Sequence, residues 1–228
     1  MPRSGPGPGS GTDDLVRAAR AVGVRDERLL RALHDTPRTR FVPAAGLASA
    51  CLDTPVPLAH GQVTTQPSLV AVMVDALALT GGERVLEVGT GLGWQTALLA
   101  RLAAHVCSVE RWPDLARQAR DNLAAQGVEN VEVVVGDGTL GLPGRAPFDA
   151  VIVCAAFPDV APPLVAQLHV GGRLVQPIGP GGAEEVELYQ RSEHGLVHVR
   201  SVISARFVRL YGTYGCPPEA PLGDPGRG

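Results

Sequence analysis

The sequence predicts an α/β fold with a doubly wound, mostly parallel sheet, helices ahead of that sheet and an antiparallel hairpin after it. Three adjacent features carry this prediction. Residues 85–88 form a short, largely apolar run of the kind seen in buried parallel strands. A glycine-rich turn follows at 89–93, and apolar residues then recur at helical spacing from Trp94 onward. Strand, glycine turn and helix make the first half of a nucleotide-binding βαβ unit.

The other elements are expected in an order that places helices first and the sheet second. Capping residues mark helix starts, as Asp26 does, and the Thr36-Pro37 pair ends the helix that follows. In the first part of the chain we expect a helix capped by Thr12 or Asp13 and carrying Leu15 to Val22, a helix carrying Leu29 to Leu33, a proline-punctuated segment at 41–67 and a helix from Pro67 to about Leu79. The sheet is then expected to have strands near 84–88, 105–109, 131–135, 149–154 and 172–177, with helices between them. Antiparallel strands are expected over 185–210.

Length and composition fit one folded unit. The chain has 228 residues, of which 45% are hydrophobic, which is enough for one buried core. We expect a single domain over 12–212, with a helical substrate-side segment at 12–80 and a cofactor-binding sheet at 81–212. The Pro/Gly-rich ends, 1–11 and 213–228, are expected to be a disordered and a flexible tail.

Charge and cysteine usage exclude several kinds of partner. The net charge is −3 and all 20 cationic residues are Arg, so no basic surface predicts nucleic-acid or anionic-membrane binding. No apolar run approaches the roughly 18 residues that would suggest a membrane helix, and no signal peptide is evident. The four cysteines are widely and irregularly spaced, which predicts neither a metal site nor a disulfide framework. We expect a cytoplasmic protein that is a monomer.

The glycine turn points to a nucleoside cofactor without phosphates. A dinucleotide fingerprint would place its third glycine at position 94, where this chain has Trp94. A Walker motif would need Lys, and the chain contains none. S-adenosylmethionine is a nucleoside cofactor that needs no phosphate cradle, so it is the cofactor that this turn favours.

Two acidic residues at strand ends support the same cofactor. Glu110 lies about 20 residues past the glycine turn, where a carboxylate accepts hydrogen bonds from ribose hydroxyls. Asp137 follows strand 131–135 between two glycines and is expected to reach the adenine edge. Glycines alone often only make turns, but both acids follow strands whose carboxyl ends should converge. The candidate cofactor-binding residues are Glu87, Gly89, Thr90, Gly91, Gly93, Glu110, Arg111, Gly136, Asp137 and Gly138, and no metal ligands are predicted.

The acceptor is expected at the segment ahead of the sheet. Methyl transfer to a good nucleophile needs positioning and exclusion of water more than acid–base help. Segment 61–67 offers two threonine hydroxyls and the start of a helix, whose free N–H groups suit a carboxylate. From these residues alone, a polar turn that caps a helix is the simpler interpretation.

The whole pattern resembles the protein-L-isoaspartate (D-aspartate) O-methyltransferase family from about Val16 to Gly212. The Thr65-Gln66-Pro67 turn and the segment 146–150 (Ala-Pro-Phe-Asp-Ala) make the match specific. Other matching motifs are Thr36-Pro37-Arg38, Phe41-Val42-Pro43, Gly61-Gln62, Val85 to Gly91, Gly136-Asp137-Gly138, Gln167-Leu168, Gly171 to Val175 and Arg206-Phe207-Val208. The resemblance implies the Rossmann-like fold of class I S-adenosylmethionine-dependent methyltransferases. It also implies methylation of the α-carboxylate of L-isoaspartyl and D-aspartyl residues in proteins or peptides, followed by succinimide formation and repair.

The resemblance also assigns roles around the acceptor. Thr65 would bind the acceptor carboxylate as the catalytic residue, Asp53 and Gln62 would shape the pocket, and Gly61 would give the turn. Alternatively, Asp53 makes only a local turn with Thr54-Pro55. His60 is not needed as a base, because an isoaspartyl carboxylate is already ionised at neutral pH. Arg206 and Arg209 either hold acidic groups of the substrate or are solvated strand residues. The candidate substrate-binding residues are Asp53, Gly61, Gln62, Thr64, Gln66 and Arg206.

Departures from the family pattern keep other functions open. Thr65 stands where the family usually has Ser, and Leu92, Trp94 and Arg209 are further differences near the expected pocket. One alternative is a dedicated aspartyl or isoaspartyl O-methyltransferase that tailors a ribosomally synthesised peptide by forming an aspartimide. A small-molecule methyltransferase would need a lid that the open segment 41–67 does not suggest. A non-enzymatic binding module fits poorly with both acids in place.

Overall fold

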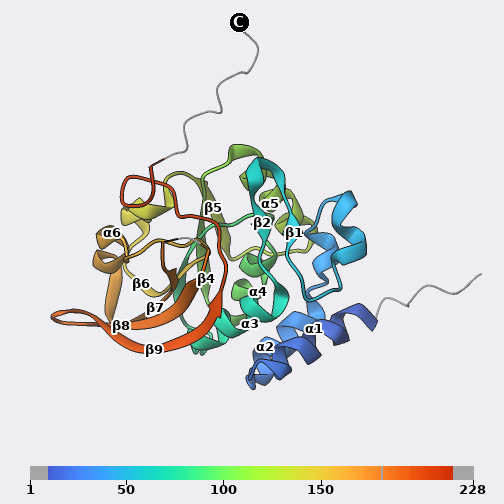
Figure 1. Ribbon diagram of the computed structural model, residues 1–228, viewed down its shortest axis with the longest axis horizontal. Coiled ribbons are helices and arrows are strands. Elements are labelled where there is room, and N and C mark those ends of the chain that lie inside the picture. The colour runs from blue at the N-terminus through green and yellow to red at the C-terminus, as the bar shows by residue number, and fades with distance from the viewer. Residues whose placement is uncertain (1–9, 181, 218–228) are drawn as a thin grey trace, which may run out of the picture.

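The computed structural model describes residues 10–180 and 182–217, with the side chain of Ser10 excepted. Figure 1 shows the N-terminal helices at one end of the long axis and the last hairpin at the other. The elements are α1 (Ser10–Ala21), α2 (Glu27–Asp35), β1 (Val56–Pro57), β2 (Val63–Thr64), α3 (Pro67–Ala76), β3 (Arg84–Val88), α4 (Trp94–Leu102), β4 (His105–Glu110), α5 (Pro113–Ala125), β5 (Val131–Val135), β6 (Phe148–Val153), α6 (Pro162–Ala166), β7 (Leu168–Ile178), β8 (Glu184–Ser192) and β9 (Gly195–Ala205).

The predicted sheet is confirmed. Seven strands lie in the order β5-β4-β3-β6-β7-β8-β9, and the first five are parallel. Strands β8 and β9 are antiparallel and form the expected terminal hairpin. The strand order reverses at β3 and β6, and ligands of such sheets bind at this switch point, beyond the carboxyl ends of the strands.

Alternate residues of the strands pack into two cores. Val85 and Ile152 belong to the core that the N-terminal helices and α4 cover. Leu86 and Val151 face the opposite side, where Leu164 of α6 packs. Because the strands are buried on both faces, their sequences are continuous apolar runs rather than alternating ones.

One expected helix is replaced by turns. Between β5 and β6 the chain makes two 3₁₀ turns, Gly138–Leu140 and Pro143–Arg145, in place of the α-helix that was predicted there. Glycine and proline recur through this connection, and both residues disfavour a continuous helix.

The ends of the described chain also differ from expectation. Helix α1 begins at Ser10, inside the expected tail, and α3 ends at Ala76, before Leu79. Residues 213–217 fold back on the sheet, because Thr213 N–H donates to Asp137 Oδ2 at 2.7 Å. The expected tails otherwise lie outside the described residues, at 1–9 and 218–228. None of the helices within the described ranges is long and apolar enough to cross a membrane.

The turn before β3 is held by the carboxylate of Glu83. This side chain accepts hydrogen bonds from Thr80 N–H at 2.9 Å, from Thr80 Oγ1 at 2.8 Å and from Gly81 N–H at 2.8 Å. Burial opposes ionisation, but these bonds outweigh it and lower the pKa of Glu83 to about 2. Since the folded pKa lies below the ordinary value, this contribution to stability is present above about pH 4.5 and is lost as the pH falls toward 2.

Replacing Glu83 with Gln should therefore lower the free energy of unfolding by about 1–3 kcal/mol at pH 7. The difference from the wild type should shrink as the pH falls below about 4.5, as measured by urea unfolding at a series of pH values. Glu129→Gln, at an exposed position, is the matched control and should change little. A Glu83→Gln deficit that stays constant with pH would contradict this role.

Candidate functional site

The glycine loop turns back over the end of β4. Gly89 and Gly91 adopt positive φ angles of 99° and 56°, a conformation that glycine reaches without strain. Gly89 N–H donates to the carbonyl of Val109 at 2.8 Å, and Gly91 N–H donates to Glu110 Oε2 at 2.9 Å. The loop and the end of β4 therefore form one rigid corner at the switch point of the sheet.

Glu87 lies beneath this corner rather than in the ligand site. Its fully buried carboxylate accepts hydrogen bonds from Gln95 Nε2 at 2.9 Å, from Thr96 Oγ1 at 2.5 Å and from Ser108 Oγ at 2.6 Å. Burial raises the pKa of Glu87 to about 7, although these three bonds oppose the shift. The predicted cofactor residue is thus a structural link between β3, α4 and β4.

Glu110 presents the carboxylate that a ribose requires. It is only 5% exposed, and its Oε1 accepts from Trp112 N–H at 3.0 Å while Oε2 accepts from Gly91 N–H. Burial raises its pKa, with the backbone hydrogen bonds opposing that shift. Because a carboxylate has about four lone-pair sites, more than these backbone donors use, acceptor capacity remains for hydroxyl groups of a ligand.

Asp137 plays a different role from the one that the sequence suggested. Its Oδ1 accepts from Thr139 N–H and Oγ1 at 2.9 and 2.6 Å, and its Oδ2 accepts from Thr213 N–H and Oγ1 at 2.7 and 2.8 Å. Both oxygens are therefore engaged in holding the turn after β5 to the C-terminal segment. The neighbouring Gly138 does line the pocket, and a Cβ there would lie 2.3 Å from Val88 Cγ1, so only glycine fits.

The acceptor side is held by the buried guanidinium of Arg38, which sequence reasoning did not assign to the site. Nη1 donates to the carbonyls of Leu52 and Thr54 at 3.3 and 3.0 Å. Nη2 donates to Thr64 Oγ1 and to the carbonyl of Thr65 at 2.5 and 3.2 Å. Burial lowers the pKa of Arg38 to about 10, so the group stays charged at neutral pH.

The carboxylate of Asp53 caps the start of α3 and is held by Gln66, and neither residue is in the pocket lining. Asp53 Oδ1 accepts from Ser68 N–H at 2.7 Å, and Oδ2 accepts from Gln66 Nε2 at 2.9 Å. The local turn that was the alternative for Asp53 is replaced by this contact with the next helix. Thr65 differs from its neighbour Thr64, because its hydroxyl makes no hydrogen bond within the part of the chain that the structure describes.

One pocket at the carboxyl ends of β3, β4 and β6 brings the two halves of the site together. Of the residues that the sequence predicted, its lining contains Gln62, Thr64, Thr65, Gly89, Thr90, Gly91, Glu110, Arg111 and Gly138. The predicted residues outside its lining are Asp53, Gly61, Gln66, Glu87, Gly93, Gly136, Asp137 and Arg206. Gly61, at φ 66°, still supplies the expected turn, and Gly93 lets α4 start close to Leu123 of α5.

The pocket also contains residues that the sequence analysis did not select. Cys154 stands at the end of β6, and the rule that located Glu110 also indicates this position. Arg209 and Tyr211 come from the C-terminal segment, so of the two C-terminal arginines that were considered, Arg209 and not Arg206 lines the pocket. Leu58, Leu92 and Trp94 complete its apolar wall, and the last two are among the departures from the family pattern noted above.

A cluster of possible metal ligands lies away from this pocket, where the sequence predicted none. The ligand atoms of His105, Cys107 and Glu132 lie within 4.8 Å of one another at the amino-terminal half of β4 and β5. Arg145 already donates to both oxygens of Glu132, at 2.7 and 2.8 Å. Within the described chain, the cluster is therefore an ion pair beside a thiol and an imidazole.

Replacing Glu110 with Ala should weaken binding of an adenosyl cofactor by roughly 1–3 kcal/mol, because ribose hydroxyls lose a charged acceptor. Isothermal titration with S-adenosylhomocysteine measures this change. Glu132→Gln removes a carboxylate at the other end of the strands and should leave the affinity unchanged. Equal affinity of Glu110→Ala and wild type would remove Glu110 from the cofactor site.

Comparison with known proteins identifies the family. The family model described as Protein-L-isoaspartate(D-aspartate) O-methyltransferase (PCMT) matches residues 10–215. A protein-L-isoaspartate O-methyltransferase of Methanoculleus marisnigri is 49% identical over 201 residues, which cover 88% of this chain and 90% of the relative. One of Anaeromyxobacter dehalogenans is 50% identical over 191 residues, which cover 83% and 91%.

Solved structures agree with the fold. A protein-L-isoaspartate O-methyltransferase matches with a TM-score of 0.80 at 28% identity, covering 90% of this chain and 67% of the other. A Plasmodium falciparum structure described as a putative protein-L-isoaspartate O-methyltransferase in complex with S-adenosyl-L-homocysteine matches with a TM-score of 0.75 at 21% identity, covering 89% and 97%. The class I methyltransferase fold is confirmed, and the chain belongs to the protein-L-isoaspartate(D-aspartate) O-methyltransferase family.

Proposed function

We propose that this chain is an S-adenosylmethionine-dependent carboxyl O-methyltransferase that methylates the α-carboxylate of L-isoaspartyl and D-aspartyl residues in proteins or peptides. The ester then closes to a succinimide, which opens the way to repair. The observation that carries the proposal is the shared pocket, whose lining joins Glu110 and the glycine loop to the Thr64-Thr65 turn.

The cofactor half of the pocket fits an adenosyl group. Glu110 retains acceptor capacity for ribose hydroxyls, and Gly89 and Gly91 line the same pocket without side chains, so a ligand can approach their backbone closely. Glu110 and the glycine loop would hold S-adenosylmethionine, which would supply a sulfonium methyl group for transfer to the acceptor oxygen and would leave as S-adenosylhomocysteine. The apolar wall formed by Leu58, Leu92 and Trp94 excludes water from this transfer.

The acceptor half fits a carboxylate. An α-carboxylate is ionised at neutral pH, so the chain needs to orient it rather than remove a proton. The Thr65 hydroxyl is available to donate a hydrogen bond to one carboxylate oxygen. Arg38 lies directly behind this turn, and its Nη2 donates to the carbonyl of Thr65 at 3.2 Å. Its charge favours an anion in front of the turn.

Other functions are less well supported. Relatives that carry the repair-enzyme name at 49–50% identity do not favour a dedicated tailoring enzyme for one peptide. Family membership likewise gives no support to a small-molecule methyltransferase or a non-enzymatic binding module. We further propose that the protein acts as a cytoplasmic monomer, without nucleic-acid or membrane partners, and light scattering after gel filtration tests its monomeric state.

Replacing Thr65 with Val should reduce kcat/KM on an isoaspartyl peptide at least about tenfold, because a hydrogen bond to a charged group is worth about 1.5–3 kcal/mol. The affinity for S-adenosylhomocysteine should stay within about twofold. Thr65→Ser keeps the hydroxyl and should retain activity, so it serves as the matched control. Unchanged kinetics in Thr65→Val would show that the acceptor binds elsewhere.

A further inference from the structure

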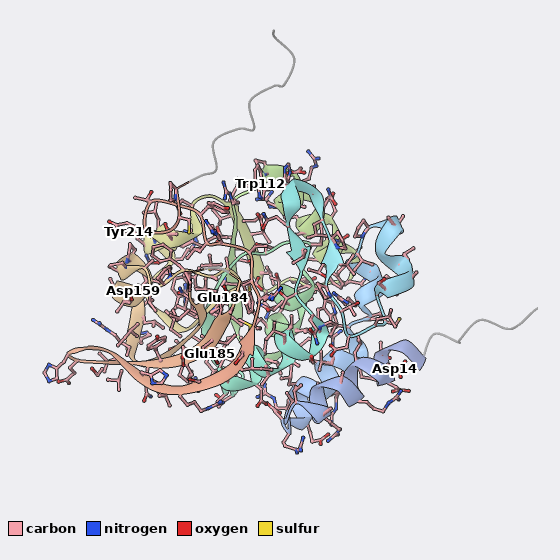
Figure 2. All side chains as sticks on the ribbon, in the orientation of Figure 1. Asp14, Trp112, Asp159, Glu184, Glu185 and Tyr214 are labelled. Atoms are coloured by element: carbon pink, nitrogen blue, oxygen red, sulfur yellow. The ribbon has the colours of Figure 1, made fainter. Side chains whose placement is uncertain are left out.

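The turn between β1 and β2 contacts the start of α5 through two rings. His60 stacks on Trp112 with ring centroids 3.9 Å apart and an interplanar angle of 7°. Figure 2 shows Trp112 beside the tip of the β1–β2 hairpin. Two segments that are about fifty residues apart in sequence are thereby joined by stacked rings.

A hydrogen-bonded pair reinforces this stack. His60 Nε2 lies 2.9 and 3.0 Å from the two carboxylate oxygens of Asp114. His60 also adopts a left-handed conformation, with φ 59° and ψ 27°, which residues with a side chain seldom occupy. The stack and the carboxylate contact therefore hold the main chain in a conformation that it would not adopt without support.

Trp112 is also in contact with residues on the cofactor side of the pocket. The Arg111 guanidinium lies 4.8 Å from the ring centroids of both Trp112 and Tyr211, and Arg111 and Tyr211 line the pocket. Trp112 N–H donates to Glu110 Oε1. The ring that His60 covers thus belongs to the corner that presents Glu110 to the ligand.

We infer that His60 is a positioning residue that fixes the acceptor turn, Gly61–Thr65, relative to the cofactor corner, Glu110–Trp112. The inference rests on the proposed function, since it assigns the acceptor to that turn. Gln62, Thr64 and Thr65 line the pocket within five residues of His60, so a shift of His60 displaces the groups that face the acceptor. Arg38 anchors one end of the segment, and His60 anchors its tip.

The decisive variant is His60→Asn, because Asn tolerates the left-handed conformation but cannot stack. We expect KM for an isoaspartyl peptide to rise about three- to tenfold, as loss of an aromatic stack predicts. The values of kcat and of the Kd for S-adenosylhomocysteine should stay within about twofold, because the reacting groups remain. The double variant His60→Asn/Trp112→Ala should have the same KM as Trp112→Ala alone, because the two single changes remove the same ring contact.

His198→Asn is the matched control. His198 also contacts a carboxylate, Glu187 at 2.7 Å, and an aromatic ring, Tyr189 at 5.5 Å, but it lies on β9 and outside the pocket lining. It should leave KM unchanged, although its effect on the melting temperature should be similar to that of His60→Asn. A KM of His60→Asn within twofold of the wild type would overturn the inference.

A second readout separates this inference from the proposed function. If the wild type does not methylate the peptide, the proposed function is wrong, and hydrogen exchange then decides the role of His60. We expect amides of residues 58–65 to exchange faster in His60→Asn than in the wild type when both bind S-adenosylhomocysteine. Equal exchange in the two proteins would show that His60 does not fix the turn.

Discussion

The acceptor side of the pocket depends on the four hydrogen bonds from the buried guanidinium of Arg38, which hold segments 52–54 and 64–65 together. The planar fork of an arginine reaches both segments at once, and a lysine ammonium has neither the span nor the fixed geometry. Burial of a charge is costly unless it is well hydrogen-bonded. The conformation of the turn that carries Thr65 is therefore determined from behind, by a group that does not itself line the pocket.

The carboxylates on the cofactor side have two different roles: some hold the fold together, and one is available to bind a ligand. Glu87 is fully buried and links β3, α4 and β4, and Asp137 uses both oxygens to hold the C-terminal segment. Only Glu110 combines backbone support with acceptor positions that face the pocket. Rigid support of this kind lowers the cost of ordering the site when a ligand binds. The two halves of the site then meet where the strand order reverses, as the topology of the sheet requires.

A local pattern, the end of a strand, selected Glu110, and the family resemblance selected Thr65; both line the same pocket. Such patterns do not predict contacts between residues that are far apart in the sequence. Arg38 binds carbonyls that lie 14 to 27 residues later, and Asp137 is engaged by Thr213, which lies 76 residues away. Asp137 therefore follows β5 as expected, but the sequence pattern did not predict its contact with the C-terminal segment. The helix expected before β6 is replaced by 3₁₀ turns for a local reason, because glycine and proline interrupt that connection.

The most direct test of the central claim is methyl transfer from labelled S-adenosylmethionine to a matched pair of short peptides, one isoaspartyl and one aspartyl. If the pocket positions an isoaspartyl α-carboxylate at Thr65, a base-labile methyl ester forms on the isoaspartyl peptide alone. Methylation of both peptides, or of neither while S-adenosylhomocysteine still binds, would contradict this assignment of the acceptor.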